Sequence, residues 1–358
     1  MPIQTYTTAA GRINKLKGEI LRHAVAKEVL SLIGLQRQIP KNVGDTVVYR
    51  RWVPYGASTG AISGGVDPQN RMITASNMQT FASSHVATEG VTPSADVLTP
   101  VDVECTLTQY ICMYGVTDKI VDLYEDDVPA EMKKQTGERV GLIREMEKYG
   151  VLRAATNAFY SGGTTRQTVD ESITLGFLRK ISRSLLANHA QKNTQILAPS
   201  ANFNTAPIES AFLVFHHTDL NPAIRDLPGF VHVSAYGNRK PVHEDELGSC
   251  EEFRFVSSPE LAPYADAATS SSASASGLLS TTGTYPDVYP IIVSGEDAWG
   301  TVALRGMGAM DTWWIPPSQR DKSDPAGQRG YIGAKFWAKS VMLNQGWAAL
   351  GEVGAPVL

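Results

Sequence analysis

Residues 56–100 form a long stretch with little apolar periodicity, and no other feature constrains the fold of this chain so strongly. An irregular connection of this length is rare inside a compact domain. Two explanations remain open: a disordered insertion, or an extended hairpin that lies on another subunit. Because a lone two-stranded hairpin is marginally stable in water, the second explanation requires a partner.

The segments on both sides of this stretch have strand character. Residues 45–53, DTVVYRRWV, are rich in valine and aromatic residues. Apolar side chains then alternate with polar ones from Val101 to Leu107, which is the period-2 pattern of a half-buried strand. The second segment therefore returns from the excursion as the second leg of a hairpin would.

Helical periodicity marks several other regions. Residues 19–33 predict a helix behind a polar arm, and a long helix is expected over Pro129–Tyr160, with Asp126 or Asp127 as its cap. The apolar residues that the long helix is expected to bury are Leu142, Ile143, Met146, Tyr149, Leu152, Ala155 and Phe159.

Two further helices are predicted before the strand-rich C-terminal part. One begins at a capping box, Thr168-x-x-Glu171, and buries Ile173, Phe177, Ile181 and Leu185. The other opens at Thr205 and Pro207, with Ile208, Ala211, Phe212 and Phe215 pointing inward. Strands and turns dominate from residue 230 onward, so the predicted fold class is α+β.

Composition excludes several classes of protein. The net charge of −4 argues against a protein that mainly coats nucleic acid. Three cysteines do not build a disulfide framework, and Cys105 and Cys112 are expected in the core. The first residues lack the apolar core of a signal peptide, and no apolar run is long enough to span a membrane, so no membrane contact is expected.

No motif assembles a catalytic centre, and we predict no catalytic, cofactor-binding or metal-binding residue. GASTG at 56–60 matches a nucleophile-elbow pattern but lacks the helix that must follow it. His216, His217 and Asp219 form a candidate metal cluster, and they keep open the alternative of a metal-dependent hydrolase. The acidic runs 125–127 and 244–246 leave a divalent-ion site open as well, although the first adjoins a helix start and the second suits a solvated turn. There is no phosphate-binding loop and no dinucleotide fingerprint.

Long blocks of the sequence resemble the major capsid proteins of podophages of the N-four type and related tailed phages. They follow one another along most of the chain, so the resemblance runs end to end. The blocks are YRRWVPYG (49–56), HVATEGVTPSAD (85–96), VTDKIVDLYEDD (116–127), EKYGVLRAATNAFYSGG (147–163), HTDLNPAIRDLPGFV (217–231), SCEEFRFVSSPELAPYADA (249–267), DVYPIIVSGEDAWG (287–300) and DPAGQRGYIGAKFWAKSVMLNQGW (324–347).

The resemblance implies the Hong Kong 97-like phage capsid fold. Its parts would be an N-terminal arm (1–44), an extended hairpin called the E-loop with its base strands (45–118), the spine helix of the peripheral domain (119–165), an axial domain (166–286), and return strands of the peripheral domain (287–358). The spine-helix residues Leu142, Ile143, Met146, Tyr149, Leu152 and Phe159 would support assembly. Trp52, Tyr55, His85 and Glu89 would make inter-subunit contacts of the E-loop.

The function implied is that of a structural protein and not an enzyme. Copies would assemble into hexamers and pentamers of an icosahedral head that encloses double-stranded DNA, which the shell holds non-specifically. The implied partners are portal and scaffolding proteins and a decoration protein, and the implied location is the virion, after assembly in the host cytoplasm. An encapsulin-like nanocompartment, which shares the fold, is the nearest alternative.

Overall fold

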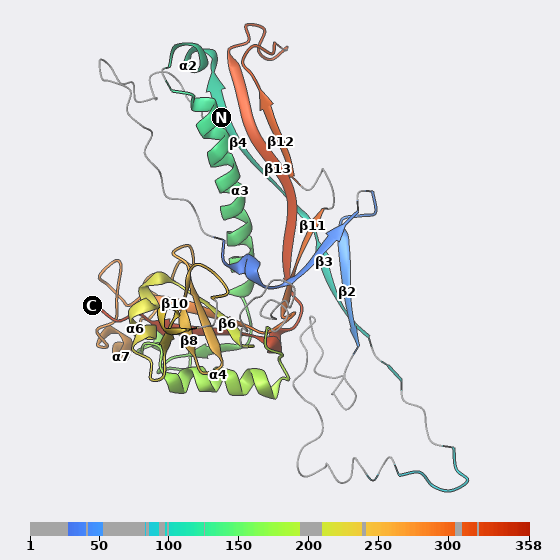
Figure 1. Cartoon of the computed structure of the whole chain (residues 1–358), viewed down its shortest axis with the longest axis vertical. Helices are drawn as coiled ribbons and strands as arrows, with labels where there is room; N and C mark the ends of the chain where they lie inside the picture. Colours follow the sequence, from blue (N-terminus) through green and yellow to red (C-terminus); the bar gives the residue numbers. More distant parts are fainter. Residues whose placement is uncertain are drawn as a thin grey trace.

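The structure is a computed structural model that describes residues 28–40, 42–52, 83, 86–92, 97–98, 100–124, 126–193, 210–237, 241–304, 310–320 and 322–358. A long helix, α3 (Val128–Leu152), stands beside a set of long strands, and both rise from a more compact body that holds a second sheet (Figure 1). A two-stranded hairpin leaves the molecule on the other side.

The compact body is built on a seven-stranded mixed sheet. Its strand order is β5-β14-β10-β6-β9-β8-β7. Strands β14 and β10 pair antiparallel, whereas β5 pairs parallel with β14 and β6 pairs parallel with β9. The strands are β5 (Ala158–Tyr160), β6 (Phe212–His216), β7 (Val231–His232), β8 (Glu246–Cys250), β9 (Phe253–Ser257), β10 (Val288–Ser294) and β14 (Ala348–Gly354).

Helices cover both faces of this sheet, and β6 shows why it is buried throughout. Phe212 and Val214 point to the face on which helix α4 (Leu175–Ala187) packs. Leu213 and Phe215 point to the opposite face, against the C-terminal end of α3. Because successive side chains of a strand alternate between faces, a central strand covered on both sides must be apolar at every position.

The second sheet lies along α3. Strand β13 (Arg329–Met342) is its centre and pairs with β4 (Thr108–Thr117) on one side, and with β11 (Trp299–Leu304) and β12 (Met310–Ile315) on the other. Strand β1 (Leu35–Ile39) adds to β11 in parallel. At Gly333 a Cβ atom would lie 2.6 Å from the Trp313 ring, so only glycine permits this close approach of the two strands.

The hairpin confirms the strand predictions at both ends of the long stretch. Strands β2 (Thr46–Trp52) and β3 (Pro100–Thr106) pair antiparallel over seven positions, from Thr46 opposite Thr106 to Trp52 opposite Pro100. Most of residues 56–100 lies outside the described residues, so the choice between an insertion and an ordered hairpin tip stays open. The shorter elements are α2 (Asp118–Leu123), α6 (Asn221–Arg225), α7 (Ser271–Ser274), η1 (Leu30–Leu32), η3 (Arg166–Thr168), η5 (Thr218–Leu220), η6 (Val233–Ala235) and η7 (Gln345–Trp347).

Three helix predictions need correction. The long helix starts as expected, with Asp127 accepting a hydrogen bond from the Ala130 N–H at 3.1 Å, but it ends at Leu152 and not at Tyr160. Phe159 therefore lies on β5 and not on the helix, because pairing with β14 draws this segment into the sheet. Helix α4 is capped by Thr174, not by the box at Thr168.

The third predicted helix is wrong in a different way. Phe212 and Phe215 belong to strand β6, and its five residues are all buried. Residues 205–209 lie outside the described part of the chain, as do residues 19–27 of the predicted N-terminal helix. Where the chain is described again, Leu30–Leu32 form one turn of 3-10 helix.

The segment 287–358 does not stay in one sheet. Strands β10 and β14 belong to the seven-stranded sheet, whereas β11, β12 and β13 build the sheet beside α3. The chain therefore passes from the compact body to the long sheet and back again within this segment. Within the described residues, no helix is both long and apolar enough to cross a lipid bilayer.

Candidate assembly surfaces

Helix α3 buries only part of the face predicted for it. Tyr149 and Leu152 lie in the core beneath the seven-stranded sheet, and Met146 packs against the same cluster. Ile143 packs against the cluster around Phe336 on β13. Leu142 is half-buried and belongs to no core cluster, so its side chain is partly available to a neighbouring molecule.

The most deeply buried charge on α3 was not predicted. Glu145 is fully buried, and its Oε1 accepts hydrogen bonds from the backbone N–H groups of Val29 and Leu30, each at 2.9 Å. Burial raises the pKa of Glu145, although both backbone N–H groups and Lys148 oppose this rise. The local sequence does not predict this contact, because the partners are more than a hundred residues apart in sequence.

Two further side chains of α3 hold the same segment. Lys148 is buried, which lowers its pKa, and its ammonium group donates to the Ser31 hydroxyl. Gly141 leaves room for the Glu28 side chain, since a Cβ atom there would lie 2.9 Å from Glu28 Oε1. Positions 141, 145 and 148 share one helix face. Residues 28–31 are thus attached to α3 at the point where the N-terminal segment leaves the described structure.

Two of the four predicted hairpin contacts lie in the part of the chain that the structure describes, and both are exposed. Trp52 is 53 % exposed, and Glu89 is exposed too, whereas Tyr55 and His85 lie outside the described residues. One face of the hairpin packs on Ile39, Leu107 and Val302 through Val47 and Tyr49. The other face shows Val48 and Trp52 to the solvent. An exposed tryptophan on a two-stranded ribbon is a surface suited to burial by another molecule.

An apolar groove with a volume of about 330 Å³ lies between α3 and the β12 edge of the long sheet. Trp313 and Trp314 line one side, and Val140 and Gly137 line the other. Lys133 crosses it, with its ammonium group 5.5 Å from the centre of the Trp314 ring. Strand β12 pairs only with β13 among the described strands, so its outer edge offers backbone groups for pairing.

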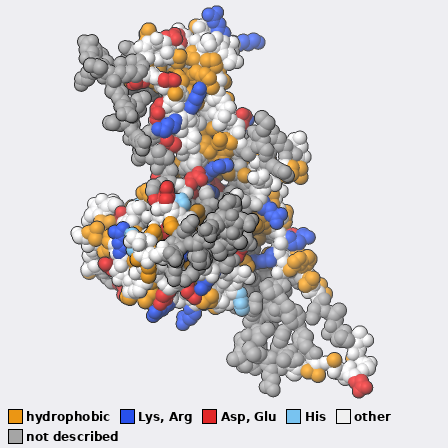
Figure 2. Space-filling model, in the orientation of Figure 1, with side chains coloured by type: hydrophobic (Ala, Val, Ile, Leu, Met, Phe, Trp, Pro, Cys, Tyr) orange, Lys and Arg blue, Asp and Glu red, His pale blue; other side chains and the backbone are white. Residues whose placement is uncertain are grey.

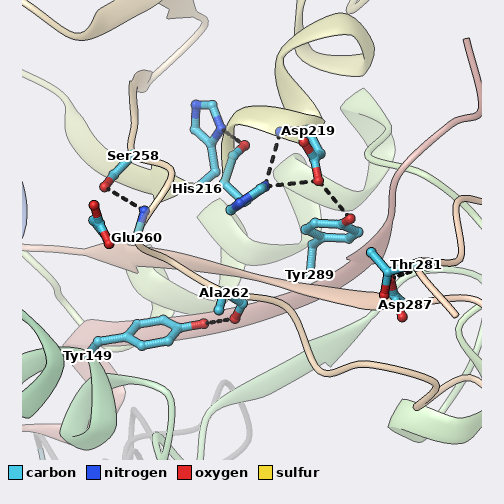
Figure 3. Close-up of polar contacts among 10 residues, drawn as sticks. Tyr149, His216, Asp219, Ser258, Glu260, Ala262, Thr281, Asp287 and Tyr289 are labelled. Carbon is cyan, nitrogen blue, oxygen red and sulfur yellow. Dashed lines mark hydrogen bonds and ion pairs between the residues drawn. The ribbon is translucent and has the colours of Figure 1, made fainter. Parts of the chain in front are cut away.

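The structure brings together only two members of the candidate metal cluster, since His217 Nδ1 lies 3.2 Å from Asp219 Oδ2. His216 is fully buried on β6, and its Nδ1 donates to the His217 carbonyl oxygen at 2.9 Å, away from the Asp219 carboxylate (Figure 3). Burial lowers the pKa of His216 to about 4 and keeps the ring neutral. The Nδ1 atom of His217 accepts the backbone N–H of Asp219 at 3.1 Å, so this imidazole caps a turn.

Asp219 is occupied as well. Its Oδ2 accepts the hydroxyl of Tyr289 at 2.8 Å (Figure 3). Among the described residues, no group of three or more histidine, cysteine or acidic side chains is arranged to hold a metal ion. Cys105, Cys112 and Cys250 are free and buried, which confirms the core positions predicted for Cys105 and Cys112.

Tyr149 connects α3 to the compact body by a polar contact. Its hydroxyl donates to the Ala262 carbonyl oxygen at 2.6 Å (Figure 3), and burial raises its pKa. Tyr149 is buried among the residues of the core, so this hydrogen bond is shielded from water. The helix and the loop before β10 are therefore fixed to each other.

Comparisons with known proteins agree with the resemblance seen in the sequence. The chain is 21 % identical over 360 residues to the major capsid protein of Pseudomonas phage KPP21, covering 92 % of this chain and 88 % of that protein. No protein-family model matches the chain.

Three solved structures show the same fold along their whole length. The capsid of Ralstonia phage GP4 matches with a TM-score of 0.64 at 10 % identity, over 100 % of this chain and 99 % of that chain. The capsid of cyanophage P-SCSP1u matches with 0.58 at 12 % identity, over 95 % and 92 %. The head of Helicobacter pylori bacteriophage KHP40 matches with 0.57 at 10 % identity, over 99 % and 98 %. The resemblance to phage major capsid proteins is confirmed, and the chain has the Hong Kong 97-like fold of phage capsid proteins.

Proposed function

We propose that this chain is a phage major capsid protein, and that its copies form hexamers and pentamers of an icosahedral head that encloses double-stranded DNA. The observation that carries the proposal is the agreement of fold and length, end to end, with capsid chains. The exposed β2–β3 hairpin supports it, because Trp52 and Val48 leave an apolar surface without cover on a single copy.

In this proposal the parts of the chain have separate tasks. The hairpin, with Trp52 and Glu89 among the described residues and Tyr55 and His85 beyond them, contacts a neighbouring copy. Helix α3 is the rigid spine, held by Tyr149, Leu152, Met146 and Ile143. Residues 166–286 lie near the capsomer centre. Leu142, half-buried on one copy, lies at or near a contact between copies.

The proposed partners follow from the same function. Portal and scaffolding proteins guide assembly in the host cytoplasm, a decoration protein binds outside, and the mature protein resides in the virion. Packaged DNA is held without sequence preference, as the net charge of −4 provides no strong attraction for phosphate. Many contacts of modest strength, repeated by symmetry, stabilise such a shell.

Electron microscopy of the full chain, expressed alone and together with its phage's scaffolding and portal proteins, tests the proposal. We expect closed particles built from six-fold and five-fold capsomers, and DNA inside particles taken from infected cells. A chain that stays monomeric in the presence of all partners would overturn the proposal. Particles that contain a protein cargo and no DNA would identify an encapsulin-like compartment.

A further inference from the structure

The apolar groove between α3 and β12 has the size and the lining of a small-molecule site. Its volume of about 330 Å³ falls within the range of about 300–1,000 Å³ that is usual for ligand pockets. Its apolar lining includes Val140 on α3, Met310 and Trp314 on β12, and Ile332 and Ala334 on β13. Figure 2 shows hydrophobic side chains gathered on the upper part of the molecule, where Figure 1 places α3 beside β12 and β13. The groove can therefore bury the apolar part of a small ligand.

The floor of this groove is fixed before any ligand binds. Val140, Ile332 and Ala334 are buried and belong to the core clusters that join α3 to the long sheet. The Thr136 hydroxyl, which also lines the groove, donates to the Met132 carbonyl oxygen at 2.7 Å, so its proton is already used. An apolar chain can thus lie on this floor without displacing a core residue or leaving a donor unpaired.

Lys133 adds one positive charge to this apolar surface. Its ammonium group lies 5.5 Å from the centre of the Trp314 ring. Among the residues that the structure describes, no carboxylate forms an ion pair with Lys133, whereas Lys335 on β13 pairs with Asp311 at 3.5 Å. Thr312 also lines the groove, and its hydroxyl can donate a second hydrogen bond. A ligand that complements the groove therefore has an apolar body and one negative charge.

We propose that this groove binds an amphipathic carboxylic acid, a medium-chain fatty acid in its simplest form. The aliphatic chain lies against Val140, Trp314 and Ile332, and the carboxylate pairs with the Lys133 ammonium group. An aliphatic chain brings no polar group onto the apolar floor, and one carboxylate matches one ammonium group. The inference does not depend on the proposed function, because a single copy of the chain forms the whole groove.

Chain length and head-group charge of the ligand test the two halves of this proposal. Isothermal titration of the unassembled chain with octanoate and decanoate, below the concentrations at which they form micelles, measures the affinity. Each CH₂ group that enters the groove should raise the affinity about fourfold, or about fifteenfold from octanoate to decanoate. Decyltrimethylammonium, with the same chain and the opposite charge, should bind at least about tenfold more weakly than decanoate. Equal affinity for the two head groups, or no dependence on chain length, would overturn the proposal.

Gly137 allows the groove to be filled without harm to the fold. It lines the groove, and a Cβ atom there would meet no heavy atom within 4 Å. Leucine also suits a helix better than glycine, so Gly137→Leu should fold and should lower the affinity for decanoate at least about tenfold. Gly150→Leu is the matched control, because Gly150 is equally open on α3 and does not line the groove. Wild-type affinity in both variants would place decanoate outside the groove.

Removal of the charge at position 133 tests the contact with the carboxylate. Lys133→Met keeps an apolar stem and should weaken decanoate about threefold to fivefold, as expected for a partly exposed ion pair. The same variant should bind decanol, which has no charge, as tightly as the wild type does. Lys134→Met is the control, since Lys134 lies about 100° further round the helix and does not line the groove. An equal loss in both lysine variants would assign the effect to net charge and would contradict the contact with Lys133.

Measurements on stability and on particles complete the test. Because a ligand that binds the folded chain stabilises it, decanoate should raise the melting temperature of the wild type and of Gly150→Leu, and should leave that of Gly137→Leu unchanged. Closed particles should bind decanoate as the unassembled chain does. Binding that disappears in particles would show that a neighbouring copy takes the groove, and would overturn the proposal. If the wild-type chain forms no particles, the proposed function fails, while titration of the unassembled chain still decides whether the groove binds the acid.

Discussion

Arg166 and Glu352 form a two-pronged ion pair at the edge of the seven-stranded sheet. Arg166 donates from Nε to Oε2 at 2.8 Å and from Nη2 to Oε1 at 2.6 Å, and the Glu352 side chain is fully buried. The guanidinium group also lies 3.6 Å from the centre of the Tyr264 ring. The pair joins η3 to β14, so it connects the turn that follows β5 to the strand that pairs with β5.

Removal of the arginine should destabilise the subunit. Arg166→Met leaves a buried carboxylate without its partner, and this should lower the free energy of unfolding by about 2 kcal/mol. The loss is smaller than that expected for a fully buried ion pair, because Arg166 is partly exposed to solvent. Urea unfolding of the unassembled chain measures this loss. The matched control is Arg179→Met, because Arg179 makes the same two-pronged contact with Glu251 on an exposed surface. An equal loss in both variants would contradict the role of burial.

The attachment of residues 28–31 should depend on an oxygen atom at position 145 and not on its charge. Glu145→Leu leaves the N–H groups of Val29 and Leu30 unpaired, at a cost of about 1–3 kcal/mol each. Glu145→Gln keeps one acceptor and removes a buried charge. Hydrogen exchange of these two amides should accelerate in the leucine variant and stay slow in the glutamine variant. Equal protection in all three proteins would show that Glu145 does not hold this segment.

Stability should fall in acid because of His216. Its pKa is about 4 in the folded chain and about 6.5 when the chain is unfolded, so only the unfolded chain binds this proton between these values. The free energy of unfolding therefore has its full contribution from neutral His216 above pH 6.5. This contribution decreases by about 3 kcal/mol in total as the pH falls to 4.

The His216→Gln variant provides the comparison, since an amide can donate to the same carbonyl and does not titrate. Unfolding free energies measured from pH 7 to pH 4 should show a smaller decrease in this variant than in the wild type. Parallel curves would mean that His216 is accessible to protons in the folded chain.

Trp52 should matter to the shell and not to the single copy. Its side chain is largely exposed on β2, so Trp52→Ala should leave the thermal unfolding of the unassembled chain unchanged. A buried interface tryptophan commonly contributes about 2 kcal/mol, so the concentration at which particles appear should rise about tenfold or more. Tyr285→Ala, at another partly exposed aromatic, serves as the control. A lower melting temperature of the monomer would place Trp52 in its own core.

Aspartate substitutions on α3 should separate folding from assembly. Leu152 is buried in the core, so Leu152→Asp should prevent folding of the chain. A carboxylate at this position would lose its hydration and gain no partner. Leu142 is half-buried and belongs to no core cluster. Leu142→Asp should therefore yield a folded monomer by circular dichroism that makes no particles. Normal particles from this variant would remove Leu142 from the assembly surfaces.

The sequence predicted elements whose local pattern and tertiary role agree. Alternation around Val101 and Val103 identified β3, and the spacing of Tyr149 and Leu152 identified the end of α3 that enters the core. The pattern failed at β6, since Phe212 and Phe215 are three residues apart and suit a helix or a strand buried on both faces. It also failed at Phe159, because this residue pairs with β14, which is almost two hundred residues away in the sequence.

The buried charged residues of α3 could not be predicted from the sequence. Glu145 and Lys148 look like solvated helix residues, and only the docking of residues 28–31 reveals their partners. By contrast, the sequence predicts Asp126 or Asp127 as the cap of the long helix, and Asp127 confirms this prediction. The exposure of Val121 and Leu123 depends on which face of α2 the long sheet covers, and no local pattern gives that information.

The position of β14 determines when a newly made chain can complete its seven-stranded sheet. β14 lies between β5 and β10 and is buried at all seven positions, yet it is synthesised about 190 residues after β5. During synthesis, β5 therefore lacks its pairing strand for about 190 residues, and β10 lacks this neighbour until Ala348–Gly354 have been made. A product that stops before Ala348 has no strand to join β5 to the rest of the seven-stranded sheet, so this sheet can be completed only after translation has passed this point.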